Sequence, residues 1–216
     1  MDQVIRCGEM MNKSARTRAA ILEQALRVAC AQGLQEITLG GIADRMGMSK
    51  SGVMTRFGSI DQLQLEVVKA YVHRFEREVF VPALAMPPGL PRLQAAFAYW
   101  CRHVAAAMGR DALYAYFARA CGEPCSPACH ALTHAVLAWR TELEHCVRQA
   151  VESGQLDAAT DSGQLAYEIY GAILLLHHDM RFHGNERAEA QATRTFQSLI
   201  TRQQGDSSWI STRVTQ

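Results

Sequence analysis

The sequence lacks long hydrophobic runs and any strong excess of charge. No apolar segment approaches the roughly 20 residues that a membrane-spanning helix needs. The first residues, MDQVIRCGEMMNKS, contain no apolar stretch of the kind found in signal peptides. The 22 Lys and Arg nearly balance the 21 Asp and Glu, which gives a formal net charge of +1. We therefore expect a cytoplasmic protein with no membrane partner, and the whole-chain charge alone does not indicate nucleic-acid binding.

Enzyme motifs and strand patterns are missing as well. The sequence has no Gly-rich phosphate loop, HExxH pair or nucleophile elbow, so we expect a protein that is not an enzyme, with no catalytic residues and no cofactor. No segment alternates polar and apolar residues as a half-buried strand does, and we predict an all-α fold of about nine helices. The seven cysteines, an odd number, are expected to be mostly reduced thiols.

Residues 37–57, ITLGGIADRMGMSKSGVMTRF, have the pattern of two short helices joined by a tight turn. Thr38 is placed to cap the first helix, Gly47 to end it, and Ser49 to cap the second. Each helix has one apolar face, spaced at helical intervals by Leu39, Ile42, Ala43 and Met46 in the first and by Val53 and Phe57 in the second. This pattern is typical of a helix-turn-helix, whose second helix lies in the major groove of DNA.

A helix predicted from Ser14 to about Gln32 precedes this motif, and Gly33 ends it. Arg16 and Arg18 fall in its first turn, where cations oppose the helix dipole, so a DNA phosphate would be a favourable partner. Plain solvation of both side chains is the alternative. Residues 1–57 carry eight Lys and Arg against five Asp and Glu, a modest basic excess that is compatible with DNA binding.

A long helix is predicted after the motif, from about Ile60 to Phe80, opening on D-Q-L behind the turn F-G-S. The first helix, the helix-turn-helix and this long helix, taken in order, resemble the N-terminal domain of TetR-family transcriptional repressors. The resemblance covers roughly residues 15–75. It implies a regulator that binds a double-stranded DNA operator.

The resemblance also implies which residues contact DNA. Thr38 and Lys50 would bind phosphate, and Arg56 stands where the family often has a histidine that holds the DNA backbone. Ser49 belongs to the same predicted surface. The residues that would face the groove are Ser51, Gly52, Met54 and Thr55. This sequence has Met54 and Thr55 in place of a frequent tyrosine pair, and Ile60 in place of a frequent lysine. We rank a base contact by Thr55 above one by Met54, which could instead be partly buried.

Four of the six prolines lie between Pro82 and Pro91, so a helix must end before this segment and another begin after it. We predict a flexible tail over 1–13, a DNA-binding domain over 14–58 and a connecting helix over 59–82. A ligand-binding and dimerisation domain would cover 83–203, followed by a second flexible tail over 204–216. Further helices are predicted at about 91–108, 112–121, 127–153, 163–183 and 186–202.

The C-terminal part, which contains the string GQLDAATDSGQLAYEIYGAILLLHH, also resembles the second domain of a TetR-family branch. The resemblance implies a homodimer, formed when the last two helices pair with their copies. The run from Ile169 to Leu176 is apolar on more than one side, as such a helix requires, although a central helix of a monomer would look the same.

The resemblance further implies a cavity for a small apolar or aromatic effector that releases the repressor from its operator. The side chains predicted to line it are Phe97, Trp100, Met108, Tyr114, Phe117, Trp139, Tyr170 and His177. Aromatic residues at helical spacing are more often ordinary core, and this reading stays open for each of them. A DNA-binding protein without a small ligand is the alternative function.

A cluster of cysteines suggests a different kind of effector. Cys121, Cys125 and Cys129, followed by His130, offer thiolate and imidazole ligands suited to zinc or copper(I). A thiol-based redox switch is a second interpretation, and ordinary buried or loop cysteines are a third. We predict no metal site, and we keep this cluster as the alternative candidate for metal binding. The histidines at 177, 178 and 183, with Asp179, are interpreted as structural or interfacial.

Overall fold

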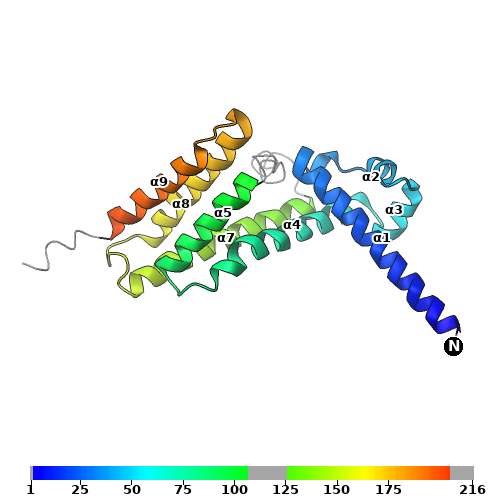
Figure 1. Cartoon of the computed structure of the whole chain (residues 1–216), viewed down its shortest axis with the longest axis horizontal. Coiled ribbons are helices and arrows are strands. Elements are labelled where there is room, and N and C mark those ends of the chain that lie inside the picture. Colours follow the sequence, from blue (N-terminus) through cyan, green and yellow to red (C-terminus); the bar gives the residue numbers. More distant parts are fainter. Residues whose placement is uncertain (1, 107–125, 205–216) are drawn as a thin grey trace, which may run out of the picture. The chain divides into compact units, whose positions relative to one another are not determined.

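The computed structural model describes residues 2–106 and 126–204. Within these ranges the chain contains eight α-helices and no strand, so the predicted all-α class is confirmed (Figure 1). The helix predicted over 112–121 lies outside the described residues. These divide into two compact units, one formed by residues 2–73 and 126–134, the other by residues 74–106 and 135–204.

The first unit contains the predicted helix-turn-helix. It consists of α1 (Asp2–Gln32), a short 3-10 turn, α2 (Leu39–Met46), α3 (Lys50–Phe57) and the first half of α4 (Ile60–Ala83). Apolar side chains from each of these helices are buried, as the helical spacing predicts. Its core includes Ile21, Ala25, Ala29, Ile42, Val53, Phe57, Leu63 and Val67.

Two helix boundaries differ from the sequence prediction. α1 begins at Asp2 rather than at Ser14, because the residues before Ser14 include no proline and extending an existing helix is easier than starting one. α4 continues through Pro82 to Ala83 rather than ending near Phe80. A proline so near the C-terminal end of the helix removes only one backbone hydrogen bond. The chain then leaves α4 through a turn in which the Ala85 N–H donates to the Pro82 carbonyl at 3.2 Å.

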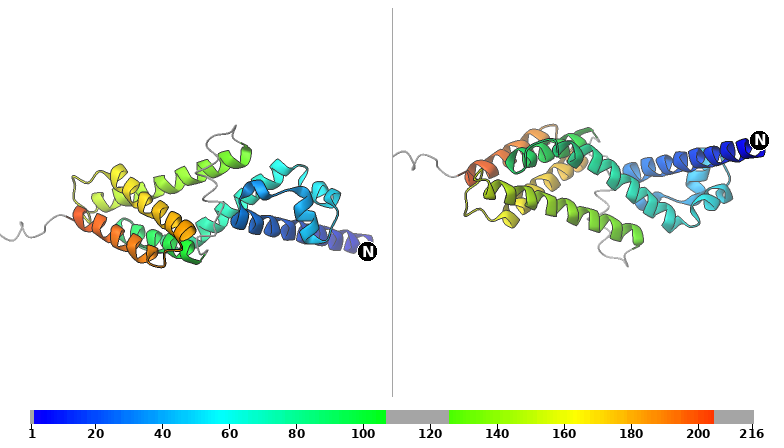
Figure 2. Two further views of the ribbon diagram at one scale, coloured as in Figure 1. Left: turned by 90° about the horizontal axis from the view of Figure 1, so that it is seen from above. Right: turned by 90° about the horizontal axis from the view of Figure 1, so that it is seen from below.

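The second unit is a helical bundle with an aromatic core. It contains the end of α4, α5 (Leu90–Ala106), most of α7 (Pro127–Glu152), α8 (Ser162–His178) and α9 (Ala188–Gln203). Phe75 packs against Trp100 and Trp139, with ring centroids 4.9 and 4.1 Å apart. Figure 2 shows α8 and α9 running alongside each other. They are joined through a π-helical turn at Asp179–His183, so the helix predicted to reach His183 changes its winding at His178.

Candidate nucleic-acid interface and ligand site

The turn between α2 and α3 forms as the sequence predicts. The Thr38 hydroxyl accepts the Gly41 N–H at 3.0 Å and so caps α2. Gly47 ends α2 in the left-handed region, with φ of 62°. The Met48 N–H donates to the Ala43 carbonyl and the Gly47 N–H to that of Asp44, the double hydrogen bond of a Schellman motif. Only glycine adopts this φ without a steric penalty, so Gly47 determines where the turn falls.

α3 begins at Lys50 and exposes one face to solvent. The Ser49 hydroxyl accepts the Gly52 N–H at 3.1 Å and caps the helix. Val53 and Phe57 are buried, which fixes the side of α3 that faces the core. The opposite side consists of exposed residues, all of them in the predicted interface: Lys50, Ser51, Met54 and Thr55.

Met54 and Thr55 lie at the centre of this exposed face. Met54 is 51% exposed, so about half of the residue is open to solvent and could contact a partner. The Thr55 hydroxyl donates to the Ser51 carbonyl at 2.8 Å, one turn earlier in the same helix. A threonine bonded in this way turns its methyl group to a defined direction and keeps oxygen lone pairs for another donor.

Arg56, in the last turn of α3, is hydrogen-bonded to Gly52, one turn earlier in the same helix. The Arg56 Nη1 donates to the Gly52 carbonyl at 2.7 Å, and the Arg56 Nε is buried with no hydrogen-bond partner among the described residues. A Cβ atom at position 52 would lie 3.0 Å from the Met48 Cε and 3.2 Å from the Ser49 Oγ. The side chain of Arg56 is thus held along α3. Glycine at position 52 leaves room for the side chains of Met48 in the turn and of Ser49, which caps the helix.

The two arginines of α1 have different surroundings. Arg16 is exposed, whereas Arg18 extends to α3 and α4. The Arg18 Nη2 donates to the Glu66 Oε2 at 3.3 Å, and its guanidinium lies 4.6 Å from the centroid of the Phe57 ring. Glu66 could not be identified from the sequence, because a contact between residues 48 positions apart leaves no local pattern.

Of the five described residues that were predicted to line an effector cavity, four are buried in the second unit. Phe97 stacks on Phe196 with ring centroids 4.2 Å apart, and Trp100 is fully buried against other aromatic rings. Tyr170 is buried and His177 is half-buried. Met108, Tyr114 and Phe117 lie outside the described residues.

Trp139 is the predicted residue that borders a cleft of about 350 Å³ between α4, α5 and α7. The other polar and aromatic groups that line this cleft were not predicted: Glu76, Phe80, Arg92, Glu142 and Cys146. The four-residue steps from Glu76 to Phe80 and from Glu142 to Cys146 could have suggested shared helix faces. Only the packing of the helices shows that these faces meet.

The cysteine cluster is described only in part. Cys121 and Cys125 lie outside the described residues. Cys129 is buried and the adjacent His130 is exposed, so these two side chains point in different directions. In the parts of the chain that the structure describes, no group of three His, Cys, Asp or Glu side chains is placed to hold a metal ion.

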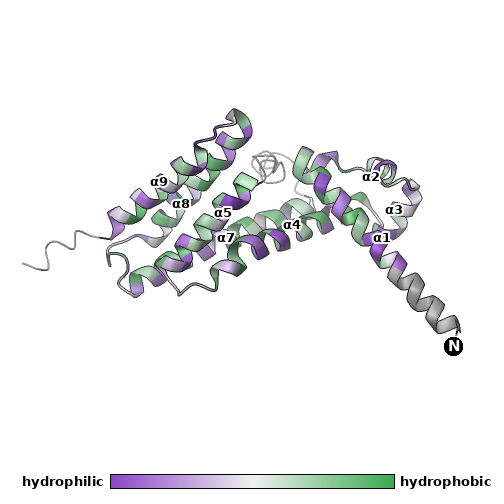
Figure 3. Cartoon of the chain, in the orientation of Figure 1, coloured by the Kyte–Doolittle hydropathy of each residue, from purple (hydrophilic) through white to green (hydrophobic). Residues whose placement is uncertain are grey.

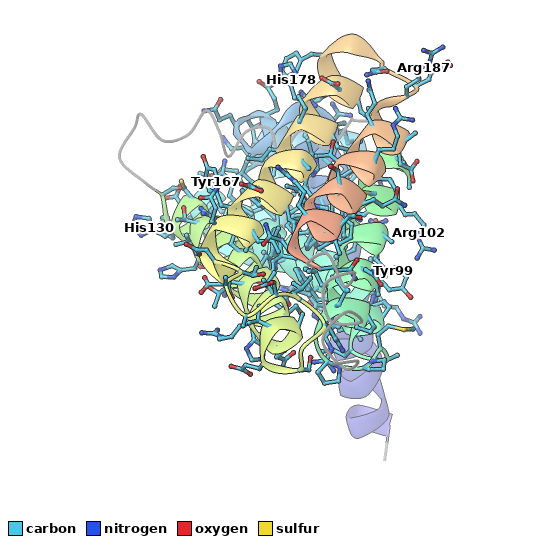
Figure 4. The ribbon with its side chains drawn as sticks, turned by 90° about the vertical axis from the view of Figure 1, so that its left-hand side faces the viewer. Tyr99, Arg102, His130, Tyr167, His178 and Arg187 are labelled. Carbon is cyan, nitrogen blue, oxygen red and sulfur yellow. The ribbon has the colours of Figure 1, made fainter. Side chains whose placement is uncertain are left out.

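α8 carries apolar residues that are exposed as well as apolar residues that are buried, and Figure 3 colours much of this helix as hydrophobic. Ile169, Ile173 and Leu176 are buried, while Leu174 and Leu175 are exposed, Leu175 by 60%. Figure 4 views α8 and α9 face on and shows Tyr167 and His178 at the surface of α8. Leu175 also borders a groove of about 520 Å³ between α8 and α9. No described helix is long and apolar enough to cross a membrane.

Two family models match the sequence. One, described as bacterial regulatory proteins of the tetR family, matches residues 21–67. The other, described as the tetracyclin repressor-like C-terminal domain, matches residues 89–196 and so covers half of the chain. A comparison with curated proteins found no match.

Solved structures share the fold over nearly their whole length. A TetR-family transcriptional regulator from Streptomyces coelicolor is 12% identical, with a TM-score of 0.71 over 89% of this chain and 97% of that one. The ketosteroid transcriptional regulator of Mycobacterium tuberculosis is 16% identical, with a TM-score of 0.64 over 88% and 96%. AibR, solved with isovaleryl coenzyme A and operator DNA, is 19% identical, with a TM-score of 0.66 over 86% and 97%.

Proposed function

The chain belongs to the TetR family of DNA-binding transcriptional regulators, and on this premise we propose that it is a repressor released from its operator by a small, largely apolar effector. The observation that carries the proposal is the exposed face of α3. Lys50, Ser51, Met54 and Thr55 share this face, on a helix held from behind by Val53 and Phe57. Such a helix can enter a major groove without disturbing the core beneath it.

The interface residues divide into two groups by chemistry. Lys50, Arg16 and the hydroxyl groups of Thr38 and Ser49 would bind phosphate and position the protein on DNA. Ser51, Met54 and Thr55 would face base edges, where a methyl group can contact thymine and a hydroxyl can accept or donate a hydrogen bond. Gly52 would allow the backbone to approach closely. Arg56 and Arg18 would support α3 through their protein contacts.

A homodimer is part of the proposal. A palindromic operator is read by a protein with two-fold symmetry, which places two copies of α3 one DNA turn apart. The exposed outer face of α8, with Leu174 and Leu175, supports α8 and α9 as the surface that pairs with a second copy. Binding to chromosomal DNA also places the protein in the cytoplasm.

The effector would act through α4. This helix is continuous from Ile60 to Ala83, with its first part in the helix-turn-helix unit and its last part bordering the cleft at Glu76 and Phe80. AibR, which has a similar structure, was solved with both isovaleryl coenzyme A and operator DNA. This supports the proposal that a protein of this fold can bind a small molecule and DNA together. An effector that binds more tightly to the conformation with low DNA affinity would shift the population away from the operator.

Footprinting tests this function. The full-length protein is bound to the DNA upstream of its own gene and to random DNA of equal length, with and without candidate effectors. We expect a protected region with two-fold symmetry that disappears when the effector is added. Equal affinity for both DNAs would refute the regulator, and a footprint that no effector changes would refute release by a ligand.

A further inference from the structure

The cleft in the second unit has the composition of a site for a charged small molecule. Glu76 and Phe80 come from α4, Trp139 and Glu142 from α7, and Arg92 from α5. Its volume of about 350 Å³ lies within the range of small-molecule sites, about 300–1,000 Å³. The cleft is therefore large enough for a compound with one aromatic ring and a short polar substituent.

Neither carboxylate that borders the cleft is paired with a cation among the described residues. The Glu76 Oε1 accepts the indole N–H of Trp139 at 3.4 Å. The Glu142 Oε1 accepts only the weak S–H donor of Cys146, at 3.9 Å. Both side chains are half-buried, so they have lost part of their hydration without gaining a positive partner. A cationic guest would supply that partner.

Arg92 also borders the cleft, and its charge opposes that of the carboxylates. Its Nη2 donates to the Met86 carbonyl at 3.2 Å, which directs this part of the guanidinium to the backbone. The thiol of Cys146 senses both charges. Its pKa is raised to about 11, first by burial and then by the charge of Glu142, and the opposing effect of Arg92 is smaller. The ionisable side chains that border the cleft, two carboxylates and one guanidinium, carry a formal net charge of −1.

We propose that the cleft binds an amphipathic organic cation, with its ammonium group between Glu76 and Glu142 and beside the rings of Trp139 and Phe80. Aromatic faces attract cations, tryptophan most strongly, and carboxylates add charge complementarity. Val81 and Leu84, which also border the cleft and are more than half exposed, supply an apolar wall for the hydrocarbon part of the guest. The inference rests on the proposed function only for its regulatory meaning, since binding can be measured without DNA.

Three probes of similar size and different charge test the proposal: benzylammonium, benzyl alcohol and benzoate. Their binding to the full chain is measured by isothermal titration calorimetry at neutral pH. We expect benzylammonium to bind most tightly and benzoate most weakly. Glu76→Gln and Glu142→Gln, combined, should reduce benzylammonium affinity roughly tenfold, as expected for the loss of charge attraction in a partly solvated site. Benzyl alcohol affinity should not change.

Glu152→Gln is the matched control, because Glu152 is an exposed glutamate at the end of α7 and away from the cleft. Thermal unfolding establishes that each variant is folded. Equal affinities for the three probes, tightest binding of benzoate, no binding of any probe, or a cation preference that survives the double substitution would each overturn the proposal. Operator binding, measured on the same samples, separates the two claims: intact operator specificity with no cation preference refutes only the cation site.

Discussion

The Arg18 guanidinium lies over the Phe57 ring, 4.6 Å from its centroid, so that a side chain of α1 covers the last residue of α3. Glu66 of α4 holds the same guanidinium at 3.3 Å. One arginine of α1 thus contacts two further helices of the DNA-binding unit, α3 and α4. From these contacts we propose that Arg18 positions α3 and that Arg16, which is exposed, is the phosphate contact of this pair.

Substituting Arg18 and Arg16 separately distinguishes positioning from phosphate contact. Arg18→Ala should destabilise the protein by about 1 kcal/mol, because it removes a cation–π contact and a partly exposed ion pair. It should weaken operator binding without changing the slope of log K against log salt. Arg16→Ala should reduce the size of that slope by about 2, because one phosphate contact is lost in each subunit of the proposed dimer, and should leave stability unchanged. Fluorescence anisotropy over a salt series measures the salt slopes of both variants, and thermal unfolding measures their stabilities. A reduced salt slope for Arg18→Ala would contradict its assignment to positioning.

Lys50 and Thr55 should differ in the sequence dependence of their effects. Lys50→Ala should weaken binding to all DNA sequences about equally, because a phosphate contact carries no sequence information. Thr55→Ala should lose about 1–3 kcal/mol of discrimination at one base position and leave random-DNA affinity unchanged. Affinities for operators substituted one base pair at a time provide the measurement. If Thr55→Ala weakened all sequences uniformly, its base contact would be refuted.

The outer face of α8 should control the oligomeric state. Leu175→Glu would place a charge in the proposed dimer interface, where burying it without a partner is costly. We expect a monomer in sedimentation velocity experiments and a loss of operator affinity. Leu137→Glu is the matched control, since Leu137 is a comparably exposed leucine on α7 of the same unit. If Leu175→Glu remained a dimer, the proposed interface on α8 would be wrong.

The thiols of Cys101 and Cys146 should resist alkylation in the native protein. Burial raises the pKa of Cys101 to about 12, with a further contribution from the charge of Glu189, and that of Cys146 is raised to about 11. At about pH 8 both groups are therefore protonated, whereas the reactive form is the thiolate. Iodoacetamide labelling followed by mass spectrometry should modify the half-buried Cys30 before it modifies Cys101 and Cys146. Equal labelling of all three cysteines before unfolding would contradict this order.

Glu78 should make stability depend on pH in the acidic range. Burial by itself would raise the pKa of Glu78, but hydrogen bonds from Arg74 and His103 outweigh it and hold the pKa below the ordinary 4.5. A lowered carboxyl pKa stabilises the folded state above the unfolded pKa, and this contribution is lost as pH falls through the folded value. Glu78→Gln should therefore destabilise the protein slightly at neutral pH, and this difference from the wild type should shrink as the pH falls below 4.5. A difference that grew on acidification would contradict this sign.

The local parts of the DNA-binding unit could be predicted from the sequence. Thr38, Gly47 and Ser49 act through hydrogen bonds and backbone angles within a few residues, so their types and spacing were sufficient to place α2 and α3. The end of α4 was harder to place, because Pro82 near the end of a helix weakens it without ending it at once.

The cleft and the support of α3 could not be predicted, because they depend on tertiary packing. Glu76 and Trp139 are 63 positions apart and meet only when α4 and α7 pack together. Phe97 had the pattern expected of either a core or a cavity wall, and its stacking on Phe196 in the core is decided by the arrangement of α5 and α9. Helical periodicity identifies which faces are apolar, but not which faces meet.

The DNA sequence that the full-length protein selects from a random pool tests the central claim most directly. We expect enrichment of a palindrome whose half-sites are separated by about one helical turn, 10–10.5 base pairs between centres. Thr55→Ala should relax the selection at one position in each half-site, because Thr55 lies on the exposed face of α3. Enrichment of no sequence, or of a site without two-fold symmetry, would contradict a dimeric regulator that reads its operator with α3.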